Sequence, residues 1–185
     1  EEQADMCVEC IDQIRLYARR KNKDLPIIGC YGTPYHTGDE EDFENIVADR
    51  AGFAKIGGHE WPQVEGVTFD LKHKIGSSGI PHGRHTATAK EMLWNQLWHA
   101  EDELQPRADV LLRGHVHYHQ YCGDAKRLGM TLPALQSMGS KYGARQCTGL
   151  VHWGMVHFDV GGGELVDWRA HIKTIKEQKA TVTEI

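Results

Sequence analysis

The chain has 185 residues, of which 40% are hydrophobic and 25% charged, and its formal net charge at pH 7 is −5. This length and apolar content are sufficient for one compact domain with a hydrophobic core. The acidic balance excludes a surface dominated by phosphate-neutralising Lys and Arg, but it neither implies nor excludes nucleic acid as a partner. No run approaches the length of a membrane span, about 18 consecutive apolar residues, so we expect no membrane partner.

The cysteines are scattered without regular spacing, which is typical of reduced thiols in an intracellular protein, and we expect a cytoplasmic location. Cys7 and Cys10 form a C-x-x-C pair. The pair lies inside a helical pattern and has no second pair to complete a zinc site, so we assign it no metal or redox role.

In the first half of the chain, helical and strand patterns alternate. Apolar residues three or four apart predict helices, and short apolar runs bounded by Gly or Pro predict strands. In chain order, we expect a helix over 3–20, a strand over 25–32, a helix over 41–51, a strand within 64–76, and a helix over 86–104. Pro106 ends the last helix, and Met92, Leu93, Leu97 and Trp98 form its apolar stripe.

The second half is rich in strand patterns separated by Gly-rich turns. We expect strands within 108–123, 130–137, 149–160 and 164–175, with Gly161 to Gly163 as a hairpin connection. The fold class is therefore α/β, with helices flanking mixed β-sheets and a β-meander at the C-terminus. We see no internal linker and predict a single domain over residues 1–185.

Three histidines occupy alternate positions in "DVLLRGHVHYH", residues 109–119, after a buried-strand pattern and Gly114. In an extended segment, residues two apart project to the same side, so His115 and His117 could converge on one site. Neutral imidazole is a common ligand of divalent transition metals. The alternative is a half-exposed strand face. We interpret His119 as a surface residue or a support for the site.

The G-H-x-H in this stretch resembles the last motif of the calcineurin-like metallophosphoesterases, and the resemblance extends over residues 26–160. "LPIIGCYGTPYHTG" is similar to the family's strand followed by Gly-Asn-His, in a variant form with Gly-Thr-x-x-His. "VTFDLKHKIG" resembles the strand that ends in a lone metal-binding histidine. The resemblance implies a layered α/β sandwich in which the C-terminal meander contributes to the second sheet.

The resemblance also implies roles for individual residues. His73 and His115 are expected to bind one metal ion and His117 the other, as a pair of divalent ions such as Mn, Fe or Zn. Thr33 stands where the family has a metal-binding Asn, and it is expected to line the substrate site. His36 is the candidate catalytic proton donor, although it could instead be a ligand.

The loop "GSSGIPHGRH", residues 76–85, is expected to border the same site. Arg84 could bind a substrate phosphate with its planar guanidinium, assisted by His82 or His85. The alternative is a solvated loop in which Ser or Thr caps the following helix. Lys141 and Tyr142 could also border the site. The remaining histidines are assigned to the surface or to satisfied core positions: His59, His99, His152, His157 and His171.

The activity implied is metal-dependent hydrolysis of a phosphate monoester or diester, with nucleic-acid substrates left open. The alternative is a catalytically degenerate phosphoesterase-like binding module or a structural metal-binding protein. The substrate, the native metal and the oligomeric state do not follow from the sequence.

The chain begins "EEQADMC", and no Asp-x-His or Gly-Asp motif precedes "LPIIGCYG". In the family these two motifs bring the remaining ligands of the first metal and the carboxylate that bridges both. We therefore expect this chain to be the C-terminal portion of a longer domain, with an exposed apolar sheet edge, and to be inactive by itself.

Overall fold

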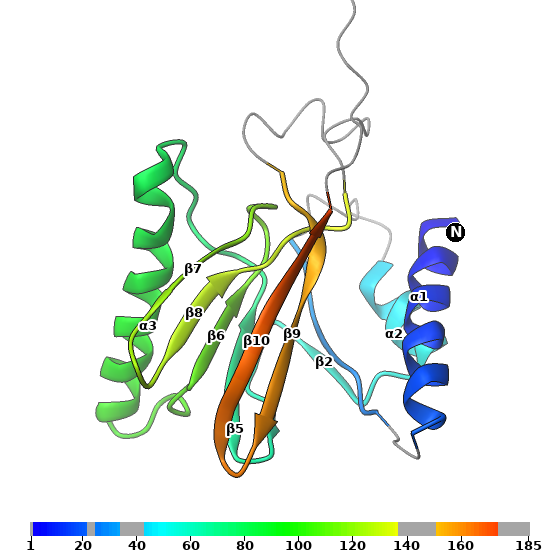
Figure 1. Ribbon diagram of the computed structural model, residues 1–185, viewed down its shortest axis with the longest axis horizontal. Coiled ribbons are helices and arrows are strands. Elements are labelled where there is room, and N and C mark those ends of the chain that lie inside the picture. Colours follow the sequence, from blue (N-terminus) through cyan, green and yellow to red (C-terminus); the bar gives the residue numbers. More distant parts are fainter. Residues whose placement is uncertain (1, 22–24, 34–42, 137–150, 174–185) are drawn as a thin grey trace, which may run out of the picture.

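The computed structural model describes residues 2–21, 25–33, 43–136 and 151–173, and it has the expected mixed α/β architecture (Figure 1). The helices are α1 (Glu2–Arg19), α2 (Phe43–Ala51) and α3 (Arg84–Ala100), with a short 3₁₀ turn η2 (Pro81–Gly83) before α3. The strands are β1 (Ile28–Cys30), β2 (Lys55–Gly57), β3 (His59–Glu60), β4 (Gln63–Val64), β5 (Val67–Lys72), β6 (Val110–Arg113), β7 (Gln120–Gly123), β8 (Leu128–Thr131), β9 (Trp153–Gly161) and β10 (Glu164–Lys173).

The central sheet has the strand order β3-β5-β6-β8-β7, with β4 paired to β5. Strands β5, β6 and β8 are parallel, in a register that places Leu71 beside Leu112 and Leu112 beside Met130. Parallel strands end at the same edge of a sheet, which we call the carboxyl rim. Residues that directly follow β5 and β6 therefore emerge side by side.

The central sheet is covered by α3 on one face and by the β9–β10 hairpin on the other (Figure 1). Alternation along the strands explains this, because successive side chains point to opposite faces. Val110, Leu112 and Met130 belong to the core that the hairpin closes, where Phe69 meets Phe158 edge to face at 5.4 Å between ring centroids. Burial of these apolar side chains supplies the main stabilisation of the two-layer core.

On the other face, the absence of a side chain at Gly129 lets α3 approach β8. A Cβ atom there would lie too close to Met92 Sδ for any real contact. Asn95, which is 4% exposed, fixes the C-terminal half of α3 by hydrogen bonds with the backbone of Pro106 and Ala108. The helix is thus anchored to the segment that leads into β6.

A second parallel pair, β1 and β2, lies beside the sheet, and α1 and α2 pack on each other on the same side of the molecule (Figure 1). Small residues such as Ala48 and Ala51 are buried between the two helices and their neighbours, and Arg50 pairs with Asp5 at 2.6 Å. The Cys30 thiol donates to the carbonyl of Leu71, which joins the end of β1 to the end of β5.

The structure confirms the helices and the longer strands and corrects details. It contains β2, β3 and β4, which are too short to give an alternating pattern in the sequence. Of the apolar stripe expected on α3, Met92 packs toward the sheet at Gly129, whereas Leu93, Leu97 and Trp98 point away from it and are 54%, 48% and 42% exposed. None of the helices in the described ranges is long and apolar enough to cross a membrane.

A buried ion pair joins β5 to β6 just before the carboxyl rim. Arg113 Nη1 lies 2.6 Å from Asp70 Oδ1, and these side chains are 2% and 1% exposed. The same nitrogen donates to the carbonyl oxygens of Asp70 and Leu112. The guanidinium also reaches Glu91 of α3 at 3.0 Å, so one side chain connects two strands and a helix.

Replacing Arg113 with Met should destabilise the fold by about 3–5 kcal/mol, because it leaves the Asp70 carboxylate buried without its cation. Urea unfolding followed by circular dichroism measures the change. The matched double variant, Arg113→Met with Asp70→Leu, should recover part of the loss because it removes both charges. A single variant as stable as the parent chain would show that the pair is dispensable.

Candidate functional site

His73 and His115 meet at the carboxyl rim. His73 directly follows Lys72, the last residue of β5, and His115 follows Arg113 and Gly114 at the end of β6. His73 Nε2 lies 3.2 Å from His115 Nδ1, and the two rings meet edge to face. The two histidines that the resemblance assigns to one metal ion therefore lie side by side.

The backbone after β6 is not extended, which corrects the reasoning that placed His115 and His117 on one side of a strand. Both residues adopt left-handed conformations, with φ of 69° and 58°. The N–H of Val116 donates to the carbonyl of Gly114 across this tight turn. Left-handed backbone at non-glycine residues is uncommon and marks a conformation that the surrounding structure imposes.

Gly114 packs closely against the His73 ring. A Cβ atom on this residue would lie 3.2 Å from His73 Nδ1. The missing side chain allows the turn after β6 to pass directly beside the His73 ring. The glycine of the G-H-x-H motif thus allows the two imidazoles to come close together.

The segment that follows β1 approaches His73. A Cβ on Gly32 would lie 4.0 Å from His73 Cε1 and 2.6 Å from Glu44 Oε1. Glu44, on α2, accepts a hydrogen bond from the Gly32 N–H at 3.0 Å. The adjacent Thr33 hydroxyl oxygen is buried and has no hydrogen-bond partner within the described ranges.

The contacts that Asp70 makes beneath the rim also set its pKa. Burial by itself would raise the pKa of Asp70, but hydrogen bonds from His59 and Arg113 and the guanidinium charge outweigh burial and hold the pKa below its usual value. His59 Nε2 lies 2.7 Å from Asp70 Oδ1. The carboxylate therefore stays ionised directly under the two rim histidines.

A shallow pocket of about 350 Å³ adjoins the turn after β6. It is lined by Pro81, Arg84, His85, His119, Gln120, Tyr121 and His152. The Arg84 guanidinium carbon lies 4.8 Å from the centre of the Tyr118 ring, and its Nε is buried without a hydrogen-bond partner in the described residues. Arg84 thus stands at the first turn of α3, at the edge of the pocket, with its guanidinium over an aromatic ring.

His119 and His152 are linked in the same pocket. The His119 N–H donates to His152 Nδ1 at 2.9 Å, and His119 Nδ1 lies 3.1 Å from the Thr131 carbonyl oxygen. Burial lowers the pKa of His119, the contact with Thr131 acts in the opposite direction, and the neighbouring His152 lowers the pKa further. His119 therefore holds the turn in place through these contacts, which agrees with its interpretation as a support for the site.

The geometry of His73 and His115 fits two ligands of one ion. Nitrogens bound to one tetrahedral zinc at bond lengths of 2.0–2.1 Å lie about 3.3 Å apart. The observed separation of 3.2 Å is close to this value and also fits an N–H···N hydrogen bond. Within the described ranges, no group of three His, Cys, Asp or Glu side chains is arranged to hold a metal ion.

The remaining predicted residues divide into two groups. His117 lies in the same turn, and its carbonyl accepts a hydrogen bond from the N–H of His152. His36, Lys141 and Tyr142 lie outside the described residues.

Sequence reasoning missed Asp70, Glu91 and Arg113, whose contacts join distant segments. Asp70 occupies the polar phase of the alternating strand 67–72, so no periodic pattern in the sequence indicates that it is buried.

Neither a family model nor a curated protein matches the chain. Among solved structures, an archaeal phosphodiesterase is similar with a TM-score of 0.46 and 13% identity, covering 88% of this chain and 74% of that one. A single mutant of Vps29 from Entamoeba histolytica has a TM-score of 0.43 and 12% identity, with coverages of 86% and 89%. Wild-type Vps29 complexed with zinc, from the same organism, has a TM-score of 0.41 and 10% identity, with coverages of 80% and 96%. These likenesses are distant and assign no role to any residue here.

The lowered pKa of Asp70 predicts a specific acid sensitivity. Its stabilising contribution is fully present above the ordinary carboxyl pKa of about 3.9 and is lost as the pH falls through the lower value of the folded state. The Asp70→Asn variant should therefore lose less stability than the parent chain between about pH 5 and pH 2, as measured by urea unfolding at each pH. Parallel pH profiles for the two proteins would contradict this assignment.

Proposed function

We propose that this chain is a metal-dependent phosphoesterase whose centre lies at the carboxyl rim. The observation that carries the proposal is the 3.2 Å approach of His73 Nε2 and His115 Nδ1 from the ends of two adjacent parallel strands. The order of motifs in the sequence supports it, since the G-H-x-H and the lone histidine resemble those of the calcineurin-like metallophosphoesterases. Ligands at the carboxyl ends of parallel strands are also the general pattern in α/β sheets.

In this proposal His73 and His115 hold one divalent ion, and His117 holds a second. Divalent ions at such a centre supply positive charge for the phosphoryl oxygens and lower the pKa of a water molecule. Manganese, iron and zinc all accept imidazole ligands. The buried Thr33 hydroxyl lines the same rim, and a polar ligand there would supply the hydrogen bond that this hydroxyl lacks within the described ranges.

The substrate is a phosphate monoester or diester, and Arg84 binds its phosphate. Stacking on Tyr118 holds the guanidinium at the edge of the pocket, where its planar donors match phosphate oxygens. His36 serves as the proton donor to the leaving oxygen or as a further ligand. An imidazole suits proton transfer near neutral pH because its ordinary pKa is about 6.5.

A second candidate function is a metal-binding module without hydrolytic activity. The observation that favours it is Thr33, which stands where the family has a metal-binding Asn. A neutral hydroxyl is a weaker ligand than the carbonyl oxygen of a side-chain amide, so one ligand position is weakened. Metal binding and turnover are therefore measured separately.

Replacing His115 with Ala should weaken binding of zinc or manganese by about tenfold or more, because it removes one imidazole of the pair. Isothermal titration calorimetry gives the affinity and the stoichiometry. His99→Ala is the matched control, since His99 lies on α3 with its ring against the carbonyl of Gln105. An unchanged stoichiometry and affinity in His115→Ala would remove this residue from the centre.

With added manganese, an upstream-extended form should hydrolyse an aryl phosphodiester and the isolated chain should not, and His117→Ala should abolish the activity of the extended form. Arg84→Ala should raise KM about tenfold or more, because a charge-assisted hydrogen bond contributes about 1.5–3 kcal/mol. Initial rates against substrate concentration separate KM from kcat. Metal binding without turnover in either form would favour the non-catalytic candidate, and DNA cleavage suppressed by salt would identify a nuclease.

A further inference from the structure

The outer face of α3 carries a cluster of large apolar side chains. Leu93, Trp94, Leu97 and Trp98 are 54%, 46%, 48% and 42% exposed, and we call these four residues the tryptophan face. The opposite side of the helix is the one that packs on the sheet, through Thr88 and Asn95. A surface helix normally buries its large apolar residues, so this reversed pattern requires an explanation.

The tryptophan face is preorganised as a contact surface. The rings of Trp94 and Trp98 are stacked, with centroids 5.9 Å apart and an interplanar angle of 28°. Stacked indoles present a broad apolar area that loses little rotamer freedom on binding. Tryptophan is also among the residues most enriched at the centres of protein interfaces.

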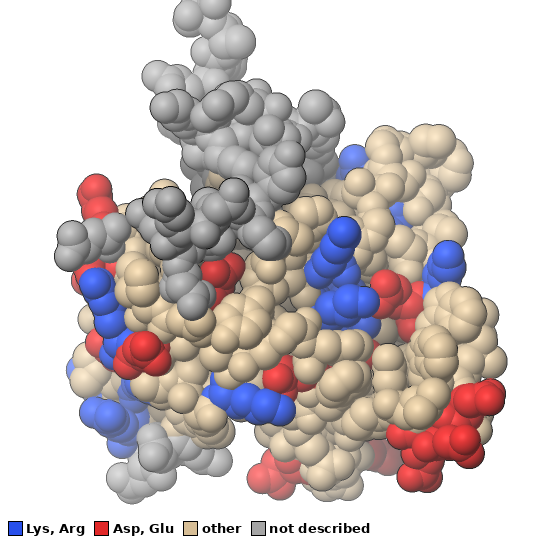
Figure 2. Space-filling view, turned by 180° about the vertical axis from the view of Figure 1, so that it is seen from behind, with Lys and Arg blue, Asp and Glu red and all other residues tan. Residues whose placement is uncertain are grey.

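The charges at the two ends of α3 are opposite to those that stabilise an isolated helix. Its first turn contains no acidic residue and holds Arg84 and His85, whereas Glu101, Asp102 and Glu103 directly follow its C-terminus. The helix dipole disfavours cations at the N-terminus and anions at the C-terminus. Figure 2 shows acidic side chains gathered at the lower right, where the C-terminal end of α3 lies, with basic side chains higher on that side.

We propose that the tryptophan face packs against the same face of a second copy of this chain, with the two α3 helices antiparallel. A twofold axis midway between Asn95 and Gln96 places Leu93 opposite Trp98 of the second copy, and Trp94 opposite its Leu97. The same register places Lys90 opposite Glu101 of the second copy. Antiparallel packing also brings the acidic end of each helix beside the basic end of the other.

Charge complementarity selects this partner and this orientation. A parallel pair would set Lys90 beside Lys90 and one acidic end beside the other. In the antiparallel pair, both ends and both Lys90–Glu101 contacts are complementary, as an interface between identical faces requires. The surface is therefore complementary to itself. A binding site for an unrelated protein does not need this property.

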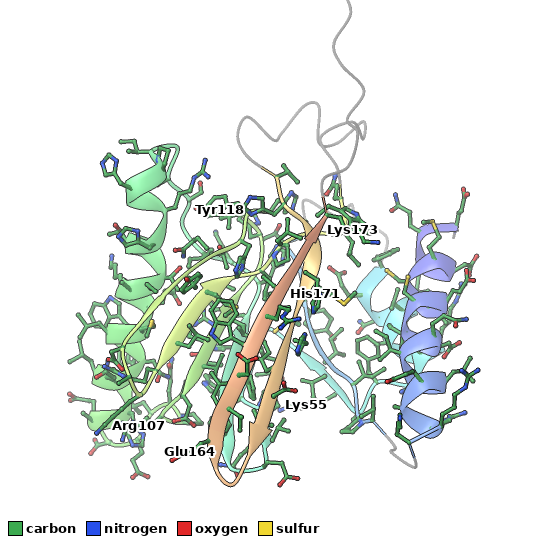
Figure 3. All side chains as sticks on the ribbon, viewed as in Figure 1. Lys55, Arg107, Tyr118, Glu164, His171 and Lys173 are labelled. Atoms are coloured by element: carbon green, nitrogen blue, oxygen red, sulfur yellow. The ribbon has the colours of Figure 1, made fainter. Side chains whose placement is uncertain are left out.

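The dimer leaves the candidate centre accessible. Arg84, at the N-terminus of α3, contacts Tyr118 near the carboxyl rim. Figure 3 places Tyr118 at the upper end of the molecule and Arg107, which follows α3, at the lower end. The tryptophan face occupies the C-terminal half of α3, so association and activity are independent properties.

Sedimentation equilibrium over a range of concentrations tests the proposal. The chain should show a reversible monomer–dimer equilibrium, and Leu97→Glu should shift it to monomer. The matched control is Val166→Glu, which also places a charge at an exposed apolar position, on β10, where Val166 is 70% exposed. It should leave the equilibrium unchanged, and circular dichroism confirms that each variant is folded.

A charge exchange tests the orientation. Lys90→Glu and Glu101→Lys should each weaken the dimer about tenfold, because each creates two like-charge contacts, and the double variant should restore the parent affinity. A monomeric chain at several hundred micromolar would overturn the proposal and leave the face to a different partner. A dimer that survives Leu97→Glu, or one that the double variant fails to restore, would also overturn it.

Discussion

The buried contact between Arg113 and Asp70 is the interaction on which the arrangement of the candidate centre depends. It fixes the ends of β5 and β6 relative to each other, and His73 and His115 emerge only a few residues beyond it. Arg113 also reaches Glu91 of α3, and Asp70 reaches His59 of β3. Two charges removed from water are costly unless every partner is in place, so the network tolerates little displacement of these elements.

Above this network, backbone conformation completes the approach of the two imidazoles. Gly114 leaves room for the His73 ring, and the left-handed turn at His115 directs the second ring toward it. The N–H of His152 donates to the carbonyl of His117, which ties the turn to the segment leading into β9. A polar site is thus built on rigid strand ends, with the apolar core of the β9–β10 hairpin on the neighbouring face of the sheet.

Helix α3 connects the two proposals without making one depend on the other. Its N-terminal turn presents Arg84 to the pocket beside the rim, its inner side supplies Glu91 to the buried network, and its outer side carries the stacked indoles. Gly129 permits the close approach to β8 that holds the helix in this position. On the inner side of α3, the polar side chain of Asn95 forms hydrogen bonds with the backbone. The large apolar side chains of the helix face outward.

The sequence by itself determined the order of helices and longer strands, because apolar spacing and Gly or Pro boundaries are local signals. It also placed His73 and His115 directly after strands, which is enough to predict that they share one edge of a parallel sheet. Only the tertiary structure decided how they meet, since the turn at His115 is left-handed and Gly114 lies close to the His73 ring. The pairing of Asp70 with Arg113 spans 43 residues, and the outward direction of the α3 stripe depends on what the sheet offers its other side. The sequence pattern shows neither the pairing nor the direction of the stripe, because each depends on segments that only folding brings together.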